Sequence, residues 1–149
     1  MPQKSPTRSP AFWGRILTLL FALAFIAAAL LAFLRSPYTL FLFTAISALF
    51  FLLISLLRRV CGQKRPYEGK ATPPPRRGTG DSFPSRHAYS AFFIATVFFG
   101  FSPLVSYMLF PAAILLSALR VMAGIHYPRD VVAGAFLGVA AAILLLILL

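Results

Sequence analysis

The sequence predicts an all-α integral membrane protein, a bundle of about five transmembrane helices, and three observations support this fold class. Of the 149 residues, 60% are hydrophobic and only 11% are charged, which is unusual for a water-soluble domain of this length. The apolar residues fall into long uncharged runs separated by short polar segments, as lipid-spanning helices require. No stretch alternates apolar and polar residues as a half-buried β-strand does.

The first two helices are expected over residues 16–34 and 36–57. Each run is uncharged and about 20 residues long, which at 1.5 Å per residue matches a hydrocarbon core about 30 Å thick. A tight turn at Arg35 makes the two helices antiparallel, with Pro37 near the start of the second. A signal peptide is the alternative for the first run, but the run is longer than such a peptide needs and no polar cleavage region follows it.

Three more helices are expected in the second half of the chain. Residues 88–119 are uncharged over about 32 positions, too many for one crossing, and Gly100, Ser102 and Pro103 supply a break between two shorter helices. Residues 131–149 form the fifth run.

Polar segments divide unequally between the two ends of this bundle. Residues 1–10 mix Pro, Ser and cations and are expected to form a disordered basic tail, followed by a single transmembrane domain over 11–149. Residues 58–87 are basic, rich in Pro and Gly, and too polar to enter lipid. If each run crosses once, this loop shares one membrane face with the tail and with residues 120–130. We therefore expect an active site on that face, with 58–87 as its polar loop.

The charge balance limits the chemistry of the site. Fourteen Lys and Arg against three Asp and Glu give a net charge of +11, so most cations need an anion from outside the chain, for which phosphate is the obvious candidate. Three acids almost exclude a two-metal carboxylate site, and one cysteine excludes a Cys-rich zinc site and an internal disulfide. We expect no metal, no other cofactor and no nucleic-acid partner.

Two segments of the polar face carry groups suited to an anion. Arg58 and Arg65 are seven residues apart, which places both guanidinium groups on one helical face if the helix continues, and guanidinium binds phosphate in bidentate fashion. Ser85 occupies the position of a helix N-cap. The N–H groups of Arg86 and His87 and the positive end of the helix dipole would then hold an oxyanion.

The third segment follows Arg120. Pro128 suits the first turn of the last helix, which leaves His126 just outside that turn and Asp130 within it, close enough for the carboxylate to hold the imidazole N–H. An imidazole oriented in this way is a nucleophile or a base. The alternative is structural: interfacial arginines extend to lipid headgroups, and a lone interfacial histidine bonds a backbone carbonyl.

Taken together, these segments resemble the three-part signature of the type-2 phosphatidic acid phosphatase and haloperoxidase superfamily, K-x6-R-P, P-S-G-H and S-R-x5-H-x3-D. The matching residues are Arg58-x6-Arg65-Pro66, Pro84-Ser85-Arg86-His87 and Arg120-x5-His126-x3-Asp130. Three motifs in the correct order, each at a helix end on one face, make a specific pattern.

The resemblance implies a lipid-phosphate phosphatase that works without metal through a phosphohistidine. His126 would attack the phosphorus, Asp130 would fix its tautomer, and His87 would protonate the departing oxygen and then activate water. The residues implied to bind phosphate are Arg58, Arg65, Ser85, Arg86 and Arg120. Polyprenyl diphosphate, phosphatidylglycerol phosphate and phosphatidate are the implied substrate types, and membrane lipids are the other expected partner.

Three positions depart from the family pattern. Arg58 replaces Lys, so a planar guanidinium stands in place of a compact ammonium. Arg86 replaces Gly and adds a cation that could bind a second phosphate or a lipid headgroup. Leu119 replaces Ser and removes a hydroxyl, for which Ser117 is a substitute. Two alternatives stay open: a lipid-binding scaffold that has lost turnover, and a phosphotransferase with an acceptor other than water.

Location and packing complete the expectations. The chain is expected in the cell membrane, and the excess of Lys and Arg on the active face favours the cytoplasmic side, although many relatives are thought to work outside. Gly134 and Gly138, four residues apart, permit close helix packing, with a dimer contact as the alternative. The many phenylalanines, Phe51 among them, are expected to pack or to face lipid, and otherwise to line an acyl or prenyl groove.

Overall fold

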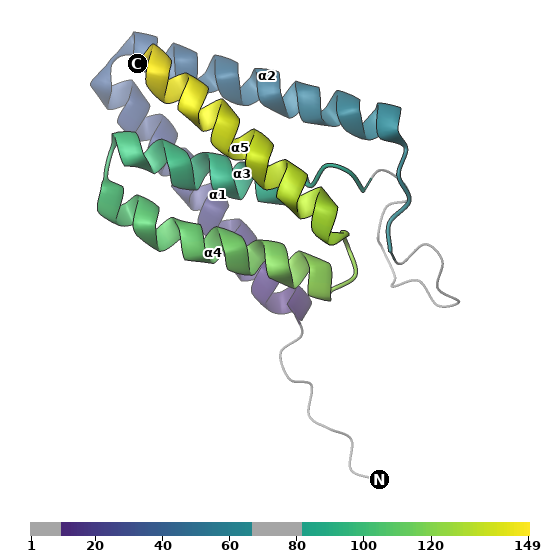
Figure 1. The fold of residues 1–149 in the computed structure, drawn as a ribbon. Coiled ribbons are helices and arrows are strands. Elements are labelled where there is room, and N and C mark those ends of the chain that lie inside the picture. Colours follow the sequence, from purple (N-terminus) through teal and green to yellow (C-terminus); the bar gives the residue numbers. More distant parts are fainter. Residues whose placement is uncertain (1–9, 67–81) are drawn as a thin grey trace, which may run out of the picture.

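The structure, a computed structural model, describes residues 10–66 and 82–149. Within these ranges the chain forms five α-helices, one 3-10 helix and no strand, which confirms the all-α bundle (Figure 1). The elements are α1 (Pro10–Arg35), α2 (Pro37–Cys61), α3 (Arg86–Val97), η1 (Phe98–Gly100), α4 (Pro103–Met122) and α5 (Pro128–Leu148). The expected tail, apart from Pro10, and residues 67–81 of the expected loop lie outside the described residues.

Proline residues mark the starts of three helices as expected, and a capping serine that was not predicted adds to them. Pro37, Pro103 and Pro128 each stand in the first turn of a helix, where a missing N–H costs nothing. Ser36 caps α2 by accepting a hydrogen bond from the backbone N of Thr39 at 3.0 Å. The proline signals are independent of tertiary contacts, which is why the sequence located them.

Four of the helices, α1, α2, α4 and α5, are long and apolar enough to cross a membrane. The fifth, α3, has 12 residues and a length of only about 18 Å, and η1 continues it to the predicted break at Gly100. Packing against α5, α4 and α1 buries most of α3 (Figure 1). Because other helices rather than lipid surround α3, the bilayer thickness does not set its length.

Two glycines let α5 lie close to α3. A Cβ built at Gly134 would collide with the backbone oxygen of Ser85, and one built at Gly138 would collide with the backbone oxygen of Tyr89. The predicted packing role of both glycines is therefore confirmed, and the partner is α3 of the same chain. This contact brings the first turn of α5 against the start of α3.

The two ends of the bundle differ in polarity. At one end, the α1–α2 turn lies near the α3–α4 connection, and Arg35 Nη1 donates to the backbone oxygen of Gly100 at 3.5 Å (Figure 1). The described polar segments, 62–66, 82–87 and 120–130, lie at the opposite end. The predicted gathering of polar residues at one end is thus found, and this end holds the site.

Candidate active site

Hydrogen bonds to backbone oxygens join the three predicted segments at the polar end of the bundle. The backbone N of Ser85 donates to the backbone oxygen of Asp130 at 2.9 Å and links the second segment to the third. The buried Arg58 links the first segment to the second, because its Nη1 donates to the backbone oxygens of Ser82 at 3.3 Å and Pro84 at 2.9 Å. Residues far apart in the chain therefore form one site.

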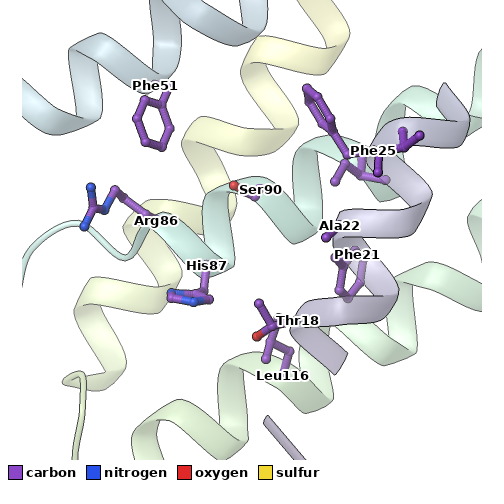
Figure 2. A pocket seen from close by; sticks show the side chains of 11 residues that line it. Thr18, Phe21, Ala22, Phe25, Phe51, Arg86, His87, Ser90 and Leu116 are labelled. Atoms are coloured by element: carbon purple, nitrogen blue, oxygen red, sulfur yellow. The ribbon is translucent and has the colours of Figure 1, made fainter. Parts of the chain in front are cut away.

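The start of α3 is built as predicted. Ser85 is fully buried and caps the helix, its Oγ accepting from the backbone N of Ala88 at 3.4 Å. Arg86 and His87 therefore occupy the first turn, where backbone N–H groups have no acceptor within the helix. The side chain of His87 makes no hydrogen bond to the residues described by the structure, and its ring faces a cavity (Figure 2).

The start of α5 holds the second histidine. Asp130 is fully buried and its Oδ2 accepts from the backbone N of Tyr127 at 2.9 Å, which fixes the turn that carries His126. Nδ1 of His126 lies 3.6 Å from Oδ2 of Asp130. The predicted pairing is present in position, but the two atoms are farther apart than in a direct hydrogen bond.

Ser82 is a site residue that the sequence reasoning missed. It is fully buried, its Oγ donates to Oδ2 of Asp130, and the same Oγ lies 3.4 Å from Nδ1 of His126. Its backbone N donates to the oxygen of Gln63 at 2.7 Å. Nothing distinguishes a loop serine by type; the available signal was its place two residues before Pro84 of the second motif.

The expected common helical face of Arg58 and Arg65 is wrong. Gly62 adopts the left-handed conformation (φ 52°) and its N donates to the oxygen of Arg58 at 3.1 Å, which ends α2 at Cys61. Arg58 is therefore helical, whereas Arg65 lies in the following loop. The charges of both arginines nevertheless act on the ring of His126.

Two further contacts orient the remaining arginines. Arg120 Nη2 donates to Oγ1 of Thr18 at 2.8 Å, so α1, which contributed no predicted site residue, also supports the site. The exposed guanidinium of Arg86 lies 5.8 Å from the ring centre of Phe51 on α2, a cation–π contact. Ser117, in contrast, is buried without a hydrogen bond to any described residue, so it does not replace the hydroxyl lost at Leu119.

The electrostatics of His87 show how closely the predicted residues gather. His87 lies at the polar start of α3, outside the four spans. Burial lowers the pKa of His87 to about 3, assisted by the charges of Arg120, His126, Arg86 and Arg65 in that order. A group of cations around a neutral imidazole is suited to binding an anion.

His126 lies in the turn between α4 and α5, also outside the spans. Burial and the charges of Arg65 and Arg58 lower its pKa to about 4, and Asp130 and a hydrogen bond to the backbone of Ser82 oppose them. The ring is therefore neutral at pH 7 and keeps a lone pair on one nitrogen. A neutral, oriented imidazole satisfies the first requirement of a nitrogen nucleophile.

An apolar cavity of about 530 Å³ opens beside His87 and continues between α1 and α3 (Figure 2). Its lining residues are Thr18, Phe21, Ala22, Phe25, Ile26, Phe51, Arg86, His87, Ser90, Ile94 and Leu116. A second cavity of about 290 Å³ shares Phe25, Phe51 and Ser90 with it and extends toward Thr44. Phe51 thus has the groove-lining role that the sequence left as an alternative.

Metal-binding residues do not cluster in the described part of the chain, where no three His, Cys, Asp or Glu side chains lie close enough together to hold an ion. The groups that do meet at the site are two imidazoles, one carboxylate, a buried serine and several guanidinium groups. This set is suited to binding a phosphate and to moving a proton at its oxygen.

A membrane-spanning helical bundle with such a set at one end defines a class of membrane proteins that act on phosphate groups. The model of the PAP2 superfamily matches residues 41–149, and the chain belongs to that superfamily. The predicted family is confirmed.

Solved structures agree with this assignment. A transmembrane PAP2-type phosphatidylglycerolphosphate phosphatase from Bacillus subtilis aligns with 98% of this chain and 78% of its own, at 18% identity and a TM-score of 0.70, which shows the shared fold. LpxE from Aquifex aeolicus aligns with 98% of this chain and 99% of its own, at 29% identity and a TM-score of 0.60. No curated protein matches the sequence.

Proposed function

We propose that the protein is a lipid-phosphate phosphatase that removes a phosphate or diphosphate headgroup through a phosphohistidine, without metal. The observation that carries this proposal is the convergence of His87, His126 and Asp130 with four arginines, next to an apolar cavity that opens beside His87. The headgroup would meet the cations while its hydrocarbon tail enters the cavity. Substrates of polyprenyl diphosphate, phosphatidylglycerol phosphate or phosphatidate type have such a charged headgroup and hydrocarbon tail.

The reaction proceeds in two steps. His126 Nε2 attacks phosphorus, an N–P bond forms, and the P–O bond to the leaving group, a lipid alcohol or a lipid monophosphate, breaks while His87 gives a proton to the departing oxygen. His87 then takes a proton from a water molecule, whose oxygen attacks the phosphorus and releases inorganic phosphate and free His126. Arg65 and Arg120, with the first-turn amides of α3, stabilise the oxygens of the transferring group.

The lowered pKa of His87 is consistent with its role as the acid, because the site in its anion-free state is strongly cationic. A bound phosphate places negative charge against the same ring and raises the pKa of His87 again. A phosphomonoester that binds as the monoanion also brings a proton with it. In both cases the proton reaches the leaving oxygen only when substrate occupies the site.

Arg86 favours a diphosphate among the candidate substrates. It lies next to His87 and lines the same cavity, which is the side on which the leaving group and its tail would lie. When the terminal phosphorus of a lipid diphosphate is attacked, the leaving group is a lipid monophosphate that carries extra negative charge. A guanidinium held over Phe51 would stabilise that charge, a task that the family's Gly at this position cannot perform.

The test is a phosphate-release panel in detergent with several lipid phosphates and diphosphates, with and without a chelator, for wild type and His126→Ala. We expect chelator-resistant release by wild type and none above background by the variant. Full turnover by His126→Ala would refute the nucleophile. Lipid binding without release would favour a scaffold, and phosphate appearing on an added alcohol faster than in water would favour a phosphotransferase.

We further propose that the active end faces the cytoplasm of the cell membrane, because among the described residues every Lys and Arg except Arg35 lies at that end. Cys61, the single cysteine, is exposed at that end of α2. An impermeant maleimide should therefore leave Cys61 unlabelled in intact cells and label it after the membrane is opened. Tyr38→Cys in a Cys61→Ser background, at the opposite end, should give the reverse result.

A further inference from the structure

Ser82 lies between the two groups that the proposed reaction requires to act together. Nδ1 of His126 and Oδ2 of Asp130 are 3.6 Å apart, beyond the 2.7–3.2 Å of an N–H···O hydrogen bond. Oγ of Ser82 is nearer to Nδ1, at 3.4 Å, and donates its proton to Oδ2 of Asp130. The hydroxyl group of Ser82 therefore contacts both the histidine and the carboxylate, and the backbone of Ser82 is a further hydrogen-bond partner of His126.

Counting donors and acceptors fixes the direction of this chain of hydrogen bonds. A carboxylate only accepts, and a hydroxyl has one proton and two lone pairs. Since the proton of Ser82 is committed to Asp130, only a lone pair is left to face Nδ1 of His126. The consistent arrangement has the proton of the neutral imidazole on Nδ1 and the lone pair on Nε2.

We propose that Ser82 is a positioning residue that bridges His126 to Asp130 and holds His126 in the tautomer whose Nε2 is free to attack phosphorus. The inference rests on the proposed function for its chemical consequence but not for its geometry. The Nδ1–Oγ distance of 3.4 Å is long for a hydrogen bond, and such contacts commonly shorten once substrate is bound.

The surroundings of Ser82 fit this role. The residue is fully buried, its backbone N donates to Gln63, and its backbone oxygen accepts from Arg58. These contacts hold the hydroxyl from both sides of the residue. Arg58, at the position where the family has Lys, thereby acts on the nucleophile through Ser82.

The experiment compares Ser82→Ala with Ser106→Ala. Ser106 is also fully buried, and its Oγ donates to the oxygen of Ala95 at 2.6 Å near the other end of the bundle, so its loss removes a buried hydrogen bond without touching the site. We expect Ser82→Ala to lower kcat by about 10- to 100-fold with KM changed less than about twofold, the size of loss found when a group that orients a metal-binding histidine is removed. Ser106→Ala should keep kcat near wild type, and Ser82→Thr, which retains the hydroxyl, should recover part of the loss.

A second readout does not depend on turnover. The chain has two histidines, so His87→Gln leaves one imidazole whose ring nitrogens can be followed by ¹⁵N NMR in detergent. We expect the proton of His126 on Nδ1 in this background and a shift toward Nε2 when Ser82→Ala is added. An unchanged tautomer together with unchanged kcat would overturn the proposal. If wild type released no phosphate from any lipid, the proposed function would fail, and the NMR result would still decide whether Ser82 is the bridge.

Discussion

Gly134→Ala tests whether the close packing of α5 on α3 sets the geometry of the active site. The added Cβ would collide with the backbone oxygen of Ser85 and would lie 3.2 Å from both the Cβ of Ala88 and the backbone N of Tyr89. None of these neighbours is the end of a flexible side chain. The two helices must therefore separate locally, by about 1 Å, to restore the 3.4 Å of ordinary van der Waals contact.

This displacement acts directly on the proposed chemistry. Ser85 begins the helix that carries His87, and it donates to the backbone oxygen of Asp130 at 2.9 Å. Moving α5 from α3 therefore moves the nucleophile away from the acid. Since a misplacement of about 1 Å can cost about 100-fold in rate, we expect kcat to fall by about that factor.

The assay is phosphate release from a lipid diphosphate in detergent, with Gly14→Ala as the matched control. A Cβ at Gly14 meets no atom within 4 Å, so the same change in composition should leave the rate unaltered. Thermal unfolding of both variants separates a displaced site from a lost fold. A folded Gly134→Ala protein with wild-type kcat, or an equal loss in Gly14→Ala, would refute the reasoning.

Three further predictions follow from the site. For a phosphomonoester, kcat/KM should rise as the pH increases through about 4, because His126 loses its proton there. It should fall above about pH 6, because the headgroup then loses the proton that the leaving oxygen needs. A rise in kcat/KM centred at about pH 6.5, the ordinary pKa of a histidine, would contradict this prediction. Arg86→Gly should lower diphosphate turnover about tenfold and leave a monophosphate with the same tail nearly unchanged, and equal losses would argue against a leaving-group contact. Thr18→Val removes the acceptor of Arg120 Nη2 and should raise KM about tenfold at similar kcat, whereas an unchanged KM would show that Arg120 is held without it.

Much of the fold follows from the sequence because each helix carries local signals. Uncharged runs of lipid-spanning length, prolines in first turns and the break at Gly100 act over a few residues and do not depend on tertiary packing. The length of α3 could not be predicted in this way. Its short span depends on enclosure by the other helices, which a count of apolar residues does not reveal.

The site was predictable where chemistry depends on a motif at a helix end. Ser85 as a cap and Asp130 in the first turn of α5 follow from residue type and spacing. The relation between Arg58 and Arg65 was misjudged, because the left-handed Gly62 ends the helix between them. A glycine that ends a helix and a glycine that continues one differ in backbone conformation, which the residue type does not show.

By itself, the sequence determined that this chain is a helical membrane protein with two histidines, an aspartate and several arginines at one end, and that it resembles a family of phosphatases. Only the tertiary structure placed Ser82 between His126 and Asp130, Thr18 against Arg120, and an apolar cavity beside His87. The physical reason is how far apart in the sequence the interacting residues lie. Spans and caps are set by neighbours along the chain, whereas these contacts join residues 44 to 102 positions apart and exist only once the helices have packed.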